Sequence, residues 1–244
     1  MSTHWDGAEV AAGFDAYDDL PESRLGYPAV FSSLRLSHAG IGRVLDYGCG
    51  PGKVAQRAAR QYRVHVEAAD SSAAMLAIAR RKRPDPLISY HLIQGNMLSF
   101  LSAGSVDAAM CCYVFINIGS LDQIRQIVAE VHRVLRPGGR FAILDTNPDT
   151  TGIQFSTFRS GEPGRVYAAG ERRQVLLAQP DGDPLEIIDF HWPKAVYEDL
   201  LRQSGFRDIQ LLEPVAADAG AHGADVALTA EADRPPFLII VGER

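Results

Sequence analysis

The middle of the chain alternates between two hydrophobic patterns. Short runs rich in Val, Ile, Leu and Ala are typical of buried strands, and the stretches between them repeat apolar residues every three or four positions, as amphipathic helices do. The clearest helical stripe consists of Leu121, Ile124, Val128, Val131 and Leu135. Strands that alternate with helices form a parallel sheet with helices packed on it, so the pattern predicts an α/β fold.

The predicted elements follow one another closely. Strands are expected over residues 43–47, 64–70, 88–94, 107–112 and 140–145, and later over 207–212 and 236–241. Helices are expected over residues 54–62, 73–83, 121–135 and 194–203. Pro84 ends the second of these helices, because proline cannot donate a backbone hydrogen bond, and the sequence Arg136-Pro137-Gly138-Gly139 separates the third from the next strand.

Two segments lie outside this alternation. Residues 1–40 contain two helical stretches, 9–16 and 29–37, and an aromatic set that could cover a ligand: Trp5, Phe14, Tyr17, Tyr27 and Phe31. Residues 147–192 form an insertion in which strands over 175–178 and 185–190 flank a Pro-Asp-Gly-Asp turn, which predicts a hairpin.

The chain therefore divides into four expected segments. They are an N-terminal helical lid over residues 1–40, a core over 41–146, a substrate-cap insertion over 147–192, and a final helix with two strands over 193–244 that completes the core. Within the last segment, residues 216–233 are rich in Ala, Asp and Gly and are expected to form a mobile loop.

Charge and hydropathy bear on the partners and the compartment. A net charge of −6 provides no positive field to attract nucleic acid, and the one basic run, Arg80-Arg81-Lys82-Arg83, is expected to stabilise a helix C-terminus. No apolar run is long enough to span a membrane, so we expect no membrane partner. The N-terminus lacks the basic and apolar segments of a signal peptide, so a cytoplasmic location is expected.

The candidate chemistry begins at the end of the first predicted strand. The sequence Val44-Leu45-Asp46-Tyr47-Gly48-Cys49-Gly50-Pro51-Gly52 places three glycines between a strand and a helix, where they allow a sharp turn and a close approach to a ligand. The spacing is G-x-G-x-G, whereas the dinucleotide fingerprint is G-x-G-x-x-G. This difference argues against a nicotinamide dehydrogenase, the competing class of enzyme.

The stretch from Asp46 to Gly52 resembles the first motif of the class I, Rossmann-like methyltransferases that use S-adenosylmethionine (SAM). The resemblance implies a mostly parallel seven-stranded sheet with helices on both faces, SAM as the cofactor and S-adenosylhomocysteine as its product. The turn over residues 135–140 and the segment 197–214 are similar to later parts of the same family. The residues that the resemblance assigns to the cofactor are Tyr17, Arg24, Asp46, Gly48, Cys49, Gly50, Asp70, Ser71, Met75, Asn96, Met97, Cys112 and Tyr113.

Several of these positions carry a specific expectation. Asp70 ends the second strand, where a carboxylate can accept both hydroxyls of a ribose. Asn96 stands where the family usually has an acid that accepts from the adenine amine, and its amide oxygen can accept that bond. Met75 and Met97 would sandwich the purine or belong to the core. The stretch that begins with Cys111-Cys112-Tyr113 resembles the family's fourth motif. Adjacent cysteines lack the spacing of metal ligands, so no metal is expected.

In the N-terminal segment, Tyr17 and Arg24 resemble residues that close over the SAM carboxylate, although packing and solvated positions are equally consistent with the sequence. The polar residues expected near the acceptor are Tyr113, Asn117, Asp145 and His191, and the catalytic candidates among them are Tyr113, Asn117 and His191. Because methyl transfer from a sulfonium depends mainly on positioning, a base is needed only if the acceptor keeps its proton. His191 has the most suitable ordinary pKa for that base.

The acceptor is expected to be a planar small molecule, methylated on a ring nitrogen or a hydroxyl, because aromatic residues are frequent in the lid and the insertion. These segments are similar to natural-product methyltransferases, including the type that N-methylates the azapteridine antibiotic toxoflavin. The alternatives are a nucleic-acid or protein methyltransferase and a non-catalytic SAM sensor. Asn147-Pro148 superficially resembles the N-P-P-Y box of adenine N6 methyltransferases. That box follows the fourth strand, whereas Asn147-Pro148 follows the fifth, which argues against the nucleic-acid alternative. Either a monomer or a homodimer is expected.

Overall fold

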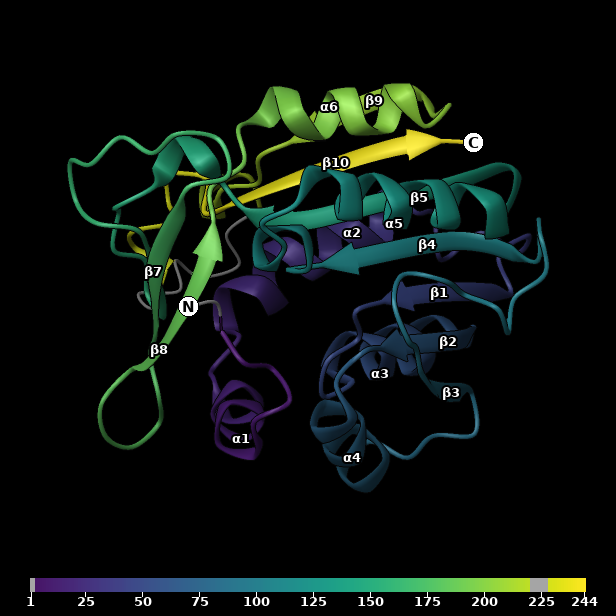
Figure 1. Ribbon diagram of the computed structural model, residues 1–244, viewed down its shortest axis with the longest axis horizontal. Coiled ribbons are helices and arrows are strands. Elements are labelled where there is room, and N and C mark those ends of the chain that lie inside the picture. The colour runs from purple at the N-terminus through teal and green to yellow at the C-terminus, as the bar shows by residue number, and fades with distance from the viewer. Residues whose placement is uncertain (1–2, 220–227) are drawn as a thin grey trace.

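The computed structural model describes residues 3–219 and 228–244 and is built around one seven-stranded sheet (Figure 1). The strand order is β3-β2-β1-β4-β5-β10-β9, and β10 runs antiparallel to both of its neighbours. The remaining pairs are parallel, which confirms the predicted mostly parallel α/β fold. The strands are β1 (Arg43–Tyr47), β2 (His65–Asp70), β3 (Ile88–Leu92), β4 (Val106–Cys112), β5 (Leu135–Thr146), β9 (Arg207–Leu212) and β10 (Phe237–Glu243).

Helices cover both faces of this sheet. α2 (Tyr27–Ser33), α3 (Lys53–Tyr62) and α4 (Ala73–Lys82) lie on one side, and α5 (Leu121–Val134) and α6 (Lys194–Gln203) on the other. Side chains of a strand alternate between the faces, so Ala108 and Met110 of β4 pack in the first core while Ala109 and Cys111 pack in the second. The central strands are apolar on both faces for this reason, whereas the edge strands β3 and β9 are partly exposed.

The apolar stripe predicted for α5 is confirmed, because Ile124, Val128 and Val131 are fully buried. The end of that helix differs from the prediction. Leu135 does not continue the helix but begins β5, where it pairs with Val106 of β4. The Pro-Gly-Gly turn is also drawn into the strand, since the backbone of residues 138 and 139 exchanges hydrogen bonds with Arg244 at the end of the chain.

The insertion after β5 forms a second, three-stranded antiparallel sheet of β6 (Phe158–Ser160), β7 (Arg172–Leu177) and β8 (Leu185–Phe190). The predicted hairpin is confirmed, and its first strand starts earlier because Arg172 pairs with Phe190. The sequence did not predict β6, since three residues are too few to show a period. In Figure 1 the arrowheads of β4 and β5 point towards this sheet, which therefore lies beyond the carboxyl ends of the parallel strands.

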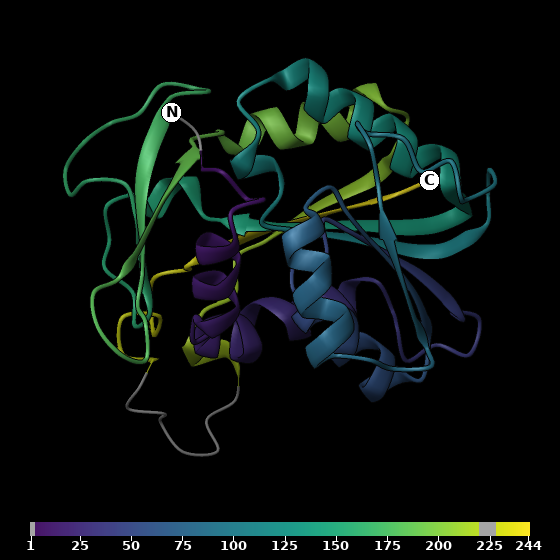
Figure 2. The same cartoon turned by 60° about the horizontal axis from the view of Figure 1, so that its bottom comes forward.

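The N-terminal segment completes the same side of the molecule. α1 (Ala8–Ala16) lies beside α4, as Figure 2 shows, and a π-helical turn, η1 (Glu22–Gly26), leads into α2. The second predicted helix starts earlier, at Tyr27, and ends at Ser33, shortly before Arg35 adopts a left-handed backbone with φ 56°. Of the loop predicted over 216–233, residues 220–227 lie outside the described residues, and Ala216–Ala219 form a short 3-10 turn, η4. In the described chain, no helix combines the length and apolarity required to traverse a membrane.

Candidate active site

The glycine-rich loop after β1 is held in a conformation that requires glycine. Gly48, Gly50 and Gly52 have φ values of 73°, 51° and 84°, in the left-handed region. A Cβ atom on Gly48 would also collide with the side chain of Val114. The amides of Gly48 and Cys49 donate to the carbonyl of Ala69, at 2.7 and 3.0 Å, so the loop is tied to the end of β2.

Asp70 connects this loop to the next helix. Its Oδ2 accepts from the amide of Gly50 and its Oδ1 from the amide of Ser72, both at 2.7 Å. Ser72 is the N-cap of α4, because its hydroxyl accepts from the amide of Met75, so the carboxylate of Asp70 does not cap this helix. Each carboxylate oxygen has a second lone pair, which leaves Asp70 able to accept from a ligand. Burial raises its pKa.

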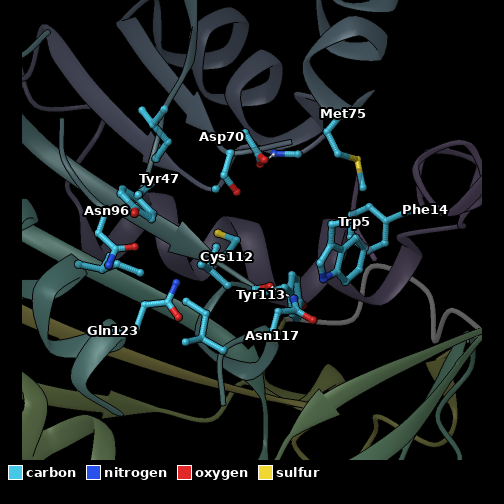
Figure 3. A pocket seen from close by; sticks show the side chains of 18 residues that line it. Trp5, Phe14, Tyr47, Asp70, Met75, Asn96, Cys112, Tyr113, Asn117 and Gln123 are labelled. Carbon is cyan, nitrogen blue, oxygen red and sulfur yellow. Dashed lines mark hydrogen bonds between the residues drawn. The ribbon is translucent and has the colours of Figure 1, made fainter. Parts of the chain in front are cut away.

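A cavity of about 390 Å³, the first cavity, opens above the loop and Asp70 (Figure 3). Asp70 and Met75 line one side, Tyr113 and Asn117 the opposite side, and Trp5 lies at one end of the ring of labelled side chains. Its lining residues are Trp5, Phe14, Tyr47, Gly48, Gly50, Asp70, Ser71, Met75, Ile93, Gly95, Asn96, Cys112, Tyr113, Val114, Asn117, Ile118, Gln123 and Ile127.

Eight of the residues expected to contact the cofactor come together in the first cavity. They are Gly48, Gly50, Asp70, Ser71, Met75, Asn96, Cys112 and Tyr113. Met97 does not join them: it is 59% exposed, because the adjacent Leu98 is the residue that turns into the core. Arg24 is exposed on η1 and is not among the lining residues.

Asp46 and Cys49 lie buried behind the loop and do not line the cavity. Burial, followed by the nearby charge of Asp70, raises the pKa of Asp46 to about 7. Burial likewise raises the pKa of the Cys49 thiol. Neither side chain is therefore placed to contact a ligand in the first cavity.

Asn96 is placed at the end of the first cavity that is opposite Trp5 (Figure 3). Its amide nitrogen donates to Oε1 of Gln126 on α5, at 2.9 Å. This bond fixes the side chain and leaves its carbonyl oxygen as the group available to a ligand. The arrangement is the one that acceptance from an adenine amine requires.

A narrower space of about 60 Å³, the second cavity, adjoins the first. The two cavities share Trp5, Phe14, Tyr113 and Asn117. Its remaining lining residues come from the N-terminal segment, from the start of α3, from the turn that follows β4, from the end of β5 and from the second sheet: Tyr17, Asp19, Glu22, Tyr27, Lys53, Ile116, Thr146, Phe158, Val175, Leu177, Ile187 and Asp189.

Tyr113 and Asn117, two of the three predicted catalytic residues, stand where the cavities meet. Tyr113 has a φ of 59°, its amide donates to the carbonyl of Leu144 at 2.7 Å, and its buried hydroxyl has no hydrogen-bond partner among the described residues. The amide nitrogen of Asn117 donates to the carbonyl of Tyr113 at 2.6 Å. The Oδ1 of Asn117 is buried and likewise has no partner in the described part of the chain.

The structure does not bring His191 to these residues. His191 lines neither cavity, and its Nδ1 lies 3.5 Å from Nη1 of Arg173. Burial and the charge of Arg173 lower its pKa. Asp189, two residues earlier on β8, does line the second cavity and forms a fully buried ion pair with Arg173 at 2.7 Å. Burial raises the pKa of Asp189 to about 6 despite that pair.

Sequence reasoning missed Asp189 and Glu22. The alternation along β8 was the available signal for Asp189, since it shares a face with the apolar Ile187. No local pattern marks Glu22. Tyr17, which was expected at the SAM carboxylate, lines the second cavity, where its hydroxyl donates to Glu22 at 2.8 Å.

A G-x-G-x-G turn after the first strand, a carboxylate at the end of the second, a cavity at the carboxyl edge of the sheet and the antiparallel strand β10 agree with the Rossmann-like class I methyltransferase type expected from the sequence. Comparison with known proteins agrees with this class. Residues 44–139 match the family model described as a methyltransferase domain.

The chain is 34% identical to an N-demethylindolmycin N-methyltransferase of Streptomyces griseus, over 99% of both chains. It is also 33% identical to a ubiquinone/menaquinone biosynthesis C-methyltransferase of Desulfotalea psychrophila, over 75% of this chain and 73% of the relative. Among solved structures, an S-adenosylmethionine dependent methyltransferase from Mesorhizobium loti has a TM-score of 0.60 and 25% identity, covering 88% of this chain and 98% of its own. The chain belongs to the family of SAM-dependent methyltransferases.

Proposed function

We propose that this enzyme transfers the methyl group of SAM, bound in the first cavity, to a nitrogen atom of a planar small molecule whose reacting edge reaches the second cavity. The second cavity, at about 60 Å³, has room for that edge and not for the whole acceptor. The observation that carries the proposal is the junction of the two cavities at Tyr113 and Asn117. A transferred group must pass directly from donor to acceptor, so two adjoining cavities with shared walls are what the reaction needs.

The first cavity fits the cofactor in size and in chemistry. Its 390 Å³ lies within the range of small-molecule sites, roughly 300–1,000 Å³. When bound, SAM supplies an electrophilic methyl group on a sulfonium that is its own leaving group. Asp70 would accept from the ribose hydroxyls, Asn96 would accept from the adenine amine, and Met75 would pack on the purine. The backbone of Cys112 and Tyr113 would face the amino-acid end.

The relative from Streptomyces griseus supports nitrogen as the methylated atom, because its name specifies an N-methyltransferase and the match extends over 99% of both chains. The rings of Trp5, Phe14 and Tyr113 at the junction support a planar acceptor. N-Demethylindolmycin is therefore the first acceptor to test, and an azapteridine is the second.

To test this proposal, the purified enzyme is incubated with methyl-labelled SAM and each acceptor, and the labelled product is identified by mass spectrometry. We expect label on a nitrogen of a small molecule. Transfer only to a protein or RNA fraction would contradict the proposal, and SAM binding without transfer to any fraction would favour a SAM sensor.

A variant tests the cofactor half separately. Asp70→Asn keeps the size of the side chain but removes its charge, and we expect the Kd for SAM, measured by calorimetry, to rise by roughly 10- to 100-fold. An unchanged Kd would contradict the role assigned to Asp70.

A further inference from the structure

Glu22 is a buried carboxyl group that the fold leaves half-satisfied. Its side chain is 4% exposed and lines the second cavity. Oε1 accepts from the hydroxyl of Tyr17 at 2.8 Å, whereas Oε2 is buried and has no hydrogen-bond partner among the described residues. A buried polar atom without a partner is costly, so its presence beside a cavity points to a partner that the cavity brings.

The position of Glu22 is fixed from several sides. The hydroxyl of Tyr17 also bonds with that of Thr157, at 2.8 Å, which ties this group to the insertion. The Nζ of Lys53 donates to the carbonyl of Tyr17 at 2.7 Å, and Arg57 holds both oxygens of Asp19, at 2.6 and 2.9 Å. Helix α3 therefore anchors the segment that carries the carboxyl group.

Among the described side chains, the titratable and charged groups that face Glu22 are Tyr17, Tyr27, Tyr113, Asp19, Lys53 and Arg57. Burial is the largest influence on the carboxyl group and raises its pKa to about 8. Hydrogen bonds from its own backbone amide and from the Tyr17 hydroxyl oppose this rise in pKa, as does the charge of Lys53, whereas the charge of Asp19 adds to it. A proton-accepting group with a pKa close to the working pH is the most effective general base.

We propose that Glu22 is the catalytic base of this enzyme, and that its Oε2 binds the N–H of the acceptor and removes the proton as the methyl group is transferred. This inference rests on the proposed function, which it extends by naming the chemical class of the acceptor. That class is a planar molecule with a nitrogen that carries a hydrogen and a lone pair. Tyr17 acts as a positioning residue that orients the carboxylate.

The atoms and electrons of this step are fully accounted for by SAM, the acceptor and Glu22. The lone pair of the acceptor nitrogen forms a bond to the methyl carbon while the carbon–sulfur bond breaks and its electron pair stays on sulfur. The proton on that nitrogen moves to Oε2 of Glu22, which becomes a neutral carboxylic acid. The products are the N-methylated acceptor and S-adenosylhomocysteine.

The experiment compares wild type with Glu22→Gln, which keeps an oxygen that can accept from Tyr17 but cannot take up a proton. The probe is N-demethylindolmycin, or the acceptor labelled in an extract if wild type does not turn it over. We expect kcat to fall by about 100-fold or more while the Kd for SAM stays within about twofold of wild type. In wild type kcat/KM should rise with pH through about 8, since Glu22 must be ionised, and the variant should lose that rise.

Two control variants accompany Glu22→Gln. Glu130 is equally buried, at 4%, but lies on α5 and lines neither cavity, so Glu130→Gln should retain the wild-type kcat and the rise with pH. His191→Gln tests the base predicted from the sequence. The Glu22 assignment is overturned if Glu22→Gln keeps kcat within threefold of wild type or keeps the pH-dependent rise, or if His191→Gln alone abolishes transfer. Failure of wild type to methylate any acceptor would instead contradict the proposed function itself.

Discussion

Glu22→Gln should change the pH dependence of stability even without any ligand. In the native protein burial raises the pKa of the Glu22 carboxyl from its ordinary value of 4.5 to about 8. The unfolded chain ionises near 4.5, so between these two values the native state holds a proton that the unfolded state has lost. Linkage then requires that the free energy of unfolding decreases as pH rises across this interval.

The magnitude follows from the two pKa values. At about 1.4 kcal/mol per pH unit, the interval between them corresponds to an upper bound on the order of 5 kcal/mol. This stabilisation is complete below pH 4.5 and is lost once the pH passes about 8. Glutamine does not titrate, so the variant should lack this contribution, and its stability relative to wild type should increase steadily between pH 5 and 8.

Urea unfolding of the two proteins at each pH from 5 to 9 measures the difference. Glu130→Gln is the matched control, because the hydrogen bonds of Glu130 to Arg133 lower its pKa and place its titration below this range. Its difference from wild type should stay constant from pH 5 to 9. A difference between Glu22→Gln and wild type that is equally flat would refute the assignment of a raised pKa to Glu22.

Three further substitutions test other parts of the site. Gly48→Ala should reduce stability by about 1–3 kcal/mol in urea unfolding and weaken SAM binding in calorimetry, because alanine disfavours the left-handed backbone there. Arg173→Met should lower the free energy of unfolding by about 3–5 kcal/mol in the same assay, because it leaves the buried Asp189 without its ion-pair partner. Adding Asp189→Leu should restore much of that stability. Val175 lines the second cavity, so Val175→Phe should obstruct the acceptor and lower its kcat/KM by at least about tenfold while the Kd for SAM stays unchanged. The control is Val166→Phe, at a position that is 92% exposed, which should alter neither quantity.

The core and the glycine-rich loop could be predicted because their causes are local. The stripe of α5 repeats over consecutive turns, and the spacing of Gly48, Gly50 and Gly52 specifies the turn within five residues. Met97 shows the limit of such reasoning. Its distance along the chain from the third strand is suitable, but Leu98 competes for the inward position and is fully buried, so Met97 faces outward.

The second cavity could not be predicted because its contacts join distant parts of the chain. Tyr17 bonds with Thr157, which is 140 residues away, and Thr146 at the end of β5 accepts from Arg173 on β7. The proposed role of Glu22 depends on a contact of this kind, since the Tyr17 hydroxyl that bonds with Thr157 is also the group that donates to Glu22. Contacts between residues so far apart along the chain leave no periodic signal in the sequence.

The backbone conformation of Tyr113 indicates which part of the chain fixes the junction of the two cavities. Its left-handed backbone costs energy for a residue other than glycine, so the surrounding structure must impose it. Two hydrogen bonds hold this residue: its amide donates to the carbonyl of Leu144 on β5, and its carbonyl accepts from the side chain of Asn117, both within the core over residues 41–146. In the proposed reaction the core therefore fixes the point at which donor and acceptor meet, whatever acceptor is bound. The insertion and the N-terminal segment supply the groups on the far side of that point, so we infer that changes in these two segments can alter the acceptor without moving the site of transfer.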